Sequence, residues 1–138
     1  MTEPPNSPNP ATALAIRVRA LTKTVQDSSG PLTILHNIDL DVPRGASLAI
    51  VGASDDVTKI GGRPLQFLRK YGFAGAIYPV NPNRATIQGL AAYPSLDALP
   101  AAPDLVVISV PGAEVEQAIE RCLAIGARGA VIYSSGFA

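Results

Sequence analysis

The fold of this chain is decided at Ser47-Leu48-Ala49-Ile50-Val51-Gly52-Ala53-Ser54. Residues 47–51 are a short, mostly apolar run, which is typical of a strand buried on both faces of a parallel sheet. Gly52-Ala53-Ser54 follows as a tight loop. Residues 60–71 then place apolar side chains at the spacing of a helix that ends at Gly72: Ile60, Pro64, Phe67, Leu68 and Tyr71. A strand, a glycine turn and a helix in this order predict the first part of a βαβ unit.

The same alternation continues along the chain. We expect strands at residues 76–80, 105–110 and 130–134, and a helix over 113–125 that is closed by Gly126. Residues 86–103 are rich in Ala, Pro and Leu and predict a short strand or turns instead of a full helix. Strands that alternate with helices predict an α/β fold, a Rossmann-like parallel sheet with helices on both faces. The second helix carries one apolar stripe: Val115, Ala118, Ile119, Cys122 and Leu123.

The residues before this alternation follow a different pattern. Apolar and polar side chains alternate over residues 14–21 and again over 32–42, with a turn cluster at 27–30 and a break near His36-Asn37. This period of two is typical of half-buried strands, so we expect an N-terminal antiparallel β pair with polar outer faces that extends the sheet. Residues 1–12 are rich in proline and polar side chains and predict a disordered tail. The expected organisation is therefore a tail at 1–12, a β segment at 13–45 and an α/β domain at 46–138.

Composition excludes several classes of function. The 138 residues hold 11 basic and 11 acidic side chains, so no net charge favours binding to nucleic acid or to an anionic membrane. No apolar run approaches the roughly 20 residues that span a bilayer, and the N-terminus lacks the pattern of a signal peptide. The single cysteine, Cys122, predicts a small core residue in a reducing, cytoplasmic compartment, with no metal site.

Motifs along the α/β part resemble a known family. They are Ile50-Val51-Gly52-Ala53-Ser54, Lys59-Ile60-Gly61-Gly62-Arg63, Ala76-Ile77-Tyr78-Pro79-Val80-Asn81-Pro82, Tyr93-Pro94-Ser95-Leu96, Asp104-Leu105-Val106-Val107-Ile108-Ser109-Val110-Pro111 and Ser134-Ser135-Gly136-Phe137. In this order they make residues 46–138 resemble the CoA-binding domain of NDP-forming acyl-CoA synthetases and of the succinyl-CoA synthetase α-subunit. The resemblance covers about two thirds of the chain and implies coenzyme A as the ligand.

The resemblance also implies which residues hold the cofactor. A glycine loop between a strand and a helix favours a phosphate, and here that loop is Gly52, Ala53 and Ser54, with Lys59 nearby. The loop after the second strand supplies Val80, Asn81, Pro82 and Arg84, and the resemblance gives Arg84 the role of a basic phosphate ligand. The later loops line the pantetheine arm and the adenine side with Val110, Pro111, Ser134 and Ser135. The alternative is that these residues form ordinary turns with solvated side chains.

Residues 14–54 resemble a second family. Leu21-Thr22-Lys23, then residues 34–45, then Leu48-Ala49-Ile50-Val51-Gly52-Ala53-Ser54 run like the start of an ABC-transporter ATP-binding subunit. In that family a Gly-x-Gly-Lys-Ser phosphate loop would follow. This chain continues with Asp55 and Asp56, whose carboxylates would repel a triphosphate. We therefore expect a recombined or designed chimera whose two parts meet within residues 50–54; the alternative is one natural family with both features.

The predicted function is CoA binding without catalytic turnover, since the phosphohistidine domain that the resembled synthetases use lies beyond this chain and no triad or carboxylate pair is visible. His36, the only histidine, belongs to the N-terminal β pair and is expected to be a polar strand residue. Two alternatives stay open: a structural protein with no ligand, and vestigial ATP binding from the ABC-like part. Because the chain stops directly after the last predicted strand, we also expect an exposed sheet edge and a homodimer.

Overall fold

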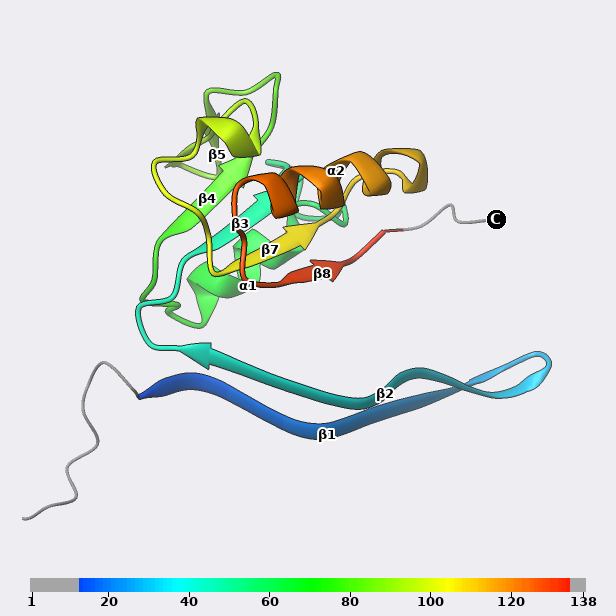
Figure 1. Cartoon of the computed structure of the whole chain (residues 1–138). Helices are drawn as coiled ribbons and strands as arrows, with labels where there is room; N and C mark the ends of the chain where they lie inside the picture. The colour runs from blue at the N-terminus through cyan, green and yellow to red at the C-terminus, as the bar shows by residue number, and fades with distance from the viewer. Residues whose placement is uncertain (1–12, 135–138) are drawn as a thin grey trace, which may run out of the picture. The chain divides into compact units, whose positions relative to one another are not determined.

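The computed structural model describes residues 13–134, so the predicted tail at 1–12 and the predicted site residue Ser135 lie outside the described residues. The chain divides into two compact units, which meet in the sequence between Gly45 and Ala46. The first holds β1 (Leu14–Asp27) and β2 (Gly30–Pro43) (Figure 1). The second holds, in chain order, β3 (Leu48–Val51), α1 (Arg63–Lys70), β4 (Ile77–Val80), β5 (Thr86–Ile87), β6 (Leu90–Ala91), the 3-10 helix η1 (Leu96–Ala98), β7 (Leu105–Ile108), α2 (Gly112–Ala124) and β8 (Ala130–Ile132).

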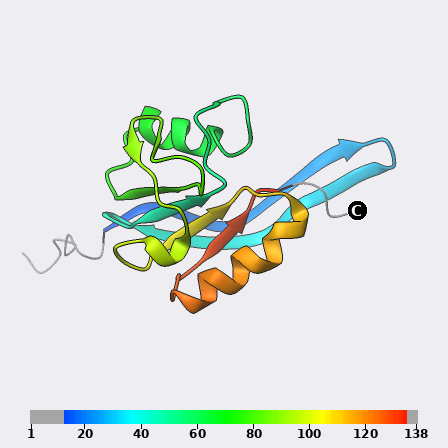
Figure 2. The same cartoon turned by 90° about the horizontal axis from the view of Figure 1, so that it is seen from above.

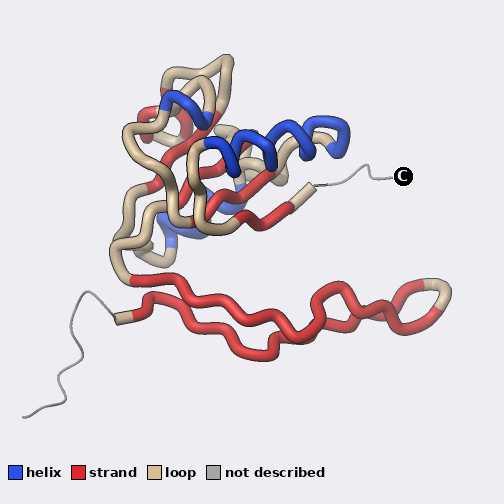
Figure 3. Tube along the Cα trace, in the orientation of Figure 1, coloured by secondary structure: helices blue, strands red, loops and turns tan. Residues whose placement is uncertain are grey.

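The first unit is a long antiparallel hairpin, as the alternation predicts (Figure 3). The turn forms because the Asp27 carboxylate accepts hydrogen bonds from the backbone N–H and the hydroxyl of Ser29, which lower the pKa of Asp27. Irregularities in register accompany positive φ angles at Ala20 and Asn37, near the predicted break. The predicted apolar face is buried only in part: Val42 is 6% exposed, whereas Leu32 and Ile34 are 49% and 52% exposed. Two strands have no second layer of their own to cover the whole face.

The second unit confirms the predicted α/β fold. Four strands form one parallel sheet in the order β4-β3-β7-β8, and the chain passes from β3 to β4 on one side before it returns to β7 on the other. The short β5–β6 hairpin lies between β4 and β7 in the sequence, where turns or a short strand are predicted. Reversal of the strand order beside β3 creates a topological switch point, and ligands bind at such points outside the carboxyl ends of the strands.

Alternate side chains of the central strand reach the two faces of the sheet. Ala49 packs in a core cluster with Val106, Ile108 and the buried residues of α2, whereas Leu48 and Ile50 pack in a second cluster with Leu65 of α1. The helices therefore cover opposite faces of the sheet (Figure 2). Both helices end with a glycine at positive φ, Gly72 and Gly126, in agreement with the predicted stops.

Two details of the predicted helices are wrong. Helix α1 begins at Arg63 and buries Leu65, while Phe67 and Tyr71 of the predicted apolar set are exposed. On α2 the buried residues are Val115, Ala118 and Cys122, as predicted, but Leu123 is 74% exposed. Helical spacing alone does not show which residues of an apolar set face the sheet. In both helices, fewer of these residues face the sheet than predicted. Burial raises the pKa of the Cys122 thiol, in keeping with its predicted core role.

A carboxylate at the amino ends of β3 and β7 joins the two strands. Asp104 Oδ2 accepts hydrogen bonds from Ser47 N at 2.8 Å and from Ser47 Oγ at 3.2 Å, and Arg128 lies 3.5 Å from its other oxygen. The backbone N–H of Ser47 is the main cause of a lowered Asp104 pKa. This contribution to stability is present above the ordinary value of 3.8 and is lost as the pH falls through the lowered pKa.

We expect Asp104→Ala to lower the free energy of unfolding at neutral pH by about 1–2 kcal/mol, because the Ser47 donors lose their acceptor. Asp104→Asn keeps an acceptor oxygen but does not titrate. Its stability is expected to depend less on pH than that of the parent protein below about pH 4. Urea denaturation at neutral and acid pH measures both effects, and an unchanged acid dependence in Asp104→Asn would contradict this role of the carboxylate.

Candidate functional site

The loop after β3 is held by its own backbone donors. Gly52 N and Ala53 N both donate to the carbonyl oxygen of Val80 at 3.2 Å, and Ser54 N donates to the carbonyl oxygen of Gly61, also at 3.2 Å. These three N–H groups are therefore engaged inside the protein. A ligand at this loop has to be held by side chains or by other backbone groups.

Glycines allow three segments to meet at this loop. Gly52 has φ +81°, and a Cβ at this position would overlap the carbonyl oxygen of Ser109 at the end of β7. A Cβ at Gly61 would overlap the carbonyl oxygen of Gly52, and one at Gly62 would overlap that of Asp56. The loop is thus folded back on itself against the end of β7, and bulkier residues would force these segments apart.

The loop after β4 is fastened to the first loop by Asn81. Its side-chain Nδ2 donates to the carbonyl oxygen of Ala53 at 2.9 Å, and its Oδ1 accepts from Asn83 N at 2.8 Å. Of the other predicted residues, Val80 is buried, whereas Pro82 and Arg84 are exposed. Arg84 and the exposed Lys59 form no ion pair with another residue of the described part of the chain. Arg84 and Lys59 are thus two exposed cations on neighbouring loops, and the Lys59 charge also acts on Asp56, whose pKa is lowered mainly by hydrogen bonds from Thr58 and in part by Lys59.

The loops after β7 and β8 are joined at the same edge of the sheet. Tyr133 N donates to the carbonyl oxygen of Ile108 at 2.8 Å, and Ser134 Oγ donates to the same oxygen at 3.2 Å. Pro111 is exposed and directly precedes α2. The Ser109 hydroxyl is buried, with no hydrogen-bond partner among residues 13–134. The predicted site residues that the structure describes thus all lie at the carboxyl edge of the sheet, either in a loop or at the end of a strand.

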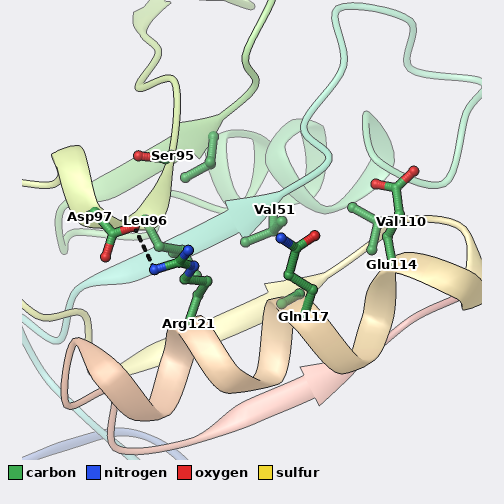
Figure 4. A pocket seen from close by; sticks show the side chains of 10 residues that line it. Val51, Ser95, Leu96, Asp97, Val110, Glu114, Gln117 and Arg121 are labelled. Atoms are coloured by element: carbon green, nitrogen blue, oxygen red, sulfur yellow. Dashed lines mark ion pairs between the residues drawn. The ribbon is translucent and has the colours of Figure 1, made fainter.

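A cleft of about 310 Å³ opens on the α2 side of this edge (Figure 4). Its apolar floor is formed at the strand ends by Val51, Val80 and Val110. Arg121 of α2 and Asp97 of η1 form an ion pair of 3.6 Å across it. The full lining is Val51, Val80, Ser95, Leu96, Asp97, Val110, Glu114, Gln117, Ala118 and Arg121.

The sequence pattern indicated Val80 and Val110 but not the rest of the cleft. Glu114, Gln117 and Arg121 recur at intervals of three and four residues beside the apolar stripe of α2, and this polar row was the available signal. The same polar row is equally typical of a helix face that is exposed to solvent. Only the placement of η1 over α2 turns the row into the wall of a cleft.

The comparison with protein families finds a match over residues 46–138 to the family model described as a CoA binding domain. The chain belongs to the CoA-binding domain family. The match begins at Ala46, where the second compact unit begins, and it agrees with the predicted resemblance to a CoA-binding domain.

This CoA-binding domain is similar to parts of larger ligases and synthetases. The acetate–CoA ligase (ADP-forming) II of Archaeoglobus fulgidus is 43% identical over 99 residues, which are 72% of this chain and 14% of that protein. A solved acetyl-coenzyme A synthetase 1 of Candidatus Korarchaeum cryptofilum, in complex with phosphate and ADP, is 42% identical with a TM-score of 0.64. That match covers 67% of this chain and 20% of the other. The chain spans about a fifth or less of the length of these relatives.

A smaller structure is also similar to the CoA-binding domain. A conserved hypothetical protein from Pyrococcus furiosus is 33% identical with a TM-score of 0.58, over 64% of this chain and 74% of that one. Together these relatives support the predicted resemblance to the synthetases. The predicted ABC-transporter origin of the hairpin, the chimera and the homodimer stay predictions.

None of the helices within residues 13–134 could span a lipid bilayer. The same residues contain no group of three or more His, Cys, Asp or Glu side chains placed to hold a metal ion. His36 is exposed on β2, where a polar strand histidine is predicted.

Proposed function

We propose that residues 46–138 bind coenzyme A at the carboxyl edge of the parallel sheet and that this chain does not itself turn over a substrate. The observation that carries the proposal is the cleft floored by Val51, Val80 and Val110, at the ends of three neighbouring strands. It lies at the switch point of the sheet, where α/β folds bind nucleotides. Its volume falls at the lower end of the range, about 300–1,000 Å³, of small-molecule sites.

The chemistry of the cleft suits the adenine end of the cofactor. Three valines offer an apolar surface to a flat ring, while the carboxylate of Glu114 and the amide of Gln117 can bond to polar groups on its edge. Glu114 and Asp97 would repel a phosphate placed beside them, and Asp97 already neutralises Arg121. We therefore assign the cleft to the base and not to the phosphates.

The phosphates of the cofactor are assigned to the loops after β3 and β4. Lys59 and Arg84 are exposed on these loops and are not neutralised by ion pairs within residues 13–134. Ser54 is half-buried and offers a hydroxyl at the start of the first loop. In this proposal Pro111 and Ser134 line the route of the pantetheine arm, as the family resemblance implies.

The alternative of ATP binding is less favoured by the loop chemistry. A phosphate loop wraps the triphosphate with free backbone N–H groups, whereas Gly52 N, Ala53 N and Ser54 N are all engaged. The exposed carboxylates of Asp55 and Asp56 oppose any phosphate at this loop, so the engaged N–H groups and not these carboxylates separate the two ligands. The structural protein without ligand remains the second alternative, and titration separates all three.

We expect calorimetric titration of the whole chain with CoA to give saturable heat and titration with Mg·ATP to give none. Lys59→Ala and Arg84→Ala should each weaken CoA binding by about threefold to tenfold, since each removes one charge near a phosphate. Lys70→Ala is the matched control. It removes an exposed cation from the other end of α1 and should leave the affinity unchanged.

Each outcome of this titration bears on one of the three functions. Silence with both ligands would overturn the proposed function in favour of a structural role, and heat with Mg·ATP alone would favour the ABC-like alternative. Equal affinities of all three variants would remove Lys59 and Arg84 from the site while leaving CoA binding itself supported.

A further inference from the structure

One residue of the β5–β6 hairpin adopts a backbone conformation that its type rarely takes. The hairpin turn consists of Gln88 and Gly89, with φ angles of +48° and +80°. Positive φ at both central residues is typical of a tight two-residue turn that favours Asn-Gly or Gly-Gly. A glutamine at the first position costs conformational energy. Contacts elsewhere must therefore stabilise it there.

Those contacts join the hairpin to both ends of the loop after β3. Gln88 Nε2 donates to the carbonyl oxygen of Ser54 at 2.9 Å and to that of Gly62 at 3.0 Å. The backbone N–H of Gln88 donates to Asp55 Oδ1 at 2.6 Å. On its other side, the carbonyl oxygen of Gln88 accepts a hydrogen bond from the Arg69 guanidinium of α1.

The backbone bond from Ser54 N to the carbonyl oxygen of Gly61 already joins the ends of the loop between β3 and α1, and the side chain of Gln88 adds a second connection across them. Ser54 stands at its beginning and Gly62 at its end, and residues 55–60 between them are all exposed. Such a segment has little apolar contact to hold it, so its order depends on its hydrogen bonds. One side-chain amide with two N–H donors can bond both carbonyl oxygens at once, whereas a carboxylate at neutral pH can bond neither.

We propose that Gln88 is a positioning residue of the cofactor site, which holds the loop of residues 54–62 in the conformation that presents Ser54 and Lys59 to the CoA phosphates. This inference rests on the proposed function for its ligand, but the clamp itself is a property of the free protein. Gln88 does not touch the cofactor in this proposal. It acts through the loop that it bridges.

Gln88→Glu tests the proposal with almost no change of shape. At pH 7.5 the introduced carboxylate faces two carbonyl oxygens and lies near Asp55, so we expect amide hydrogen exchange over residues 54–62 to accelerate and CoA affinity to fall about tenfold. At about pH 5 partial protonation restores one donor. The ratio of variant to parent affinity should then recover by at least about threefold, an effect that a general loss of stability would not produce.

Gln66→Glu is the matched control, because it makes the same chemical change at an exposed position of α1. It should leave both exchange and affinity as in the parent protein at each pH. The inference is overturned if Gln88→Glu keeps parental exchange over residues 54–62, or if it binds CoA as the parent does at pH 7.5. It is also overturned if the loss of affinity does not depend on pH.

Failure of the proposed function would look different. If the parent protein binds no CoA, the affinity arm is silent for every variant, while the exchange arm still reports whether Gln88 holds the loop. Fast exchange in Gln88→Glu without CoA binding in the parent would then support the clamp and overturn its assignment to a CoA site.

Discussion

Gly52→Ala is expected to lower the free energy of unfolding of the α/β unit by about 3 kcal/mol or more. Two effects add at this position. The backbone has φ +81°, which an L side chain adopts at a cost, and the new Cβ would overlap the carbonyl oxygen of Ser109. This overlap is with backbone at the end of β7, so no side chain can turn away to relieve it. Denaturant unfolding followed by tyrosine fluorescence measures the change, because all four tyrosines lie beyond residue 70.

Gly126→Ala separates the two effects. Gly126 has φ +75°, close to that of Gly52, but a Cβ there meets nothing within 4 Å. Its cost should be about 1–2 kcal/mol, the conformational part alone. Equal losses of stability in the two variants would show that the approach of β7 to the loop does not matter. They would leave the positive φ as the only reason for a glycine after β3.

Gln117→Trp is expected to weaken CoA binding by about a hundredfold or more, which corresponds to roughly 2.7 kcal/mol. Gln117 is exposed on α2, and its side chain points from the helix toward Val51 in the floor of the cleft (Figure 4). An indole in this place would occupy the space that we assign to adenine. Because the residue lies outside the core, stability should change by no more than about 0.5 kcal/mol.

Glu116→Trp provides the comparison for this variant. It adds the same indole at the neighbouring exposed position of α2, which does not line the cleft. Its CoA affinity in calorimetry should match that of the parent protein. If Gln117→Trp bound CoA as tightly as Glu116→Trp, the adenine would have to lie elsewhere along the edge, and the assignment of the cleft would be wrong.

The fold of residues 46–138 could be predicted because its signals are local. The apolar run at 47–51, the glycines that end both helices and the alternation of strand and helix depend on neighbouring residues only. The burial of the helices was harder to predict. Leu65 rather than Phe67 meets the sheet, and Leu123 does not meet it. The direction of a helix on a sheet depends on residues that are distant in the sequence.

The candidate site likewise has a part that could be predicted from the sequence and a part that could not. The loops at 52–54, 80–84, 110–111 and 134 could be predicted from the alternation of strands and helices together with the family resemblance, since parallel strands bring their carboxyl ends to one edge. The cleft wall on α2 and the clamp at Gln88 do not follow from it. Gln88 reaches Ser54 across 34 positions of sequence, and Arg121 reaches back to Asp97 in another element, contacts that no local pattern contains.

The sequence by itself determined a parallel α/β sheet after residue 45, a hairpin before it and the edge at which a cofactor would bind. Tertiary structure decided which face of each helix is buried, that η1 and α2 enclose a cleft, and that one glutamine amide bridges both ends of a loop. The physical reason is the separation along the chain between the residues that set each feature. Backbone conformation and the period of apolar side chains are set within a few residues, whereas cavities and bridging hydrogen bonds exist only once distant segments have packed.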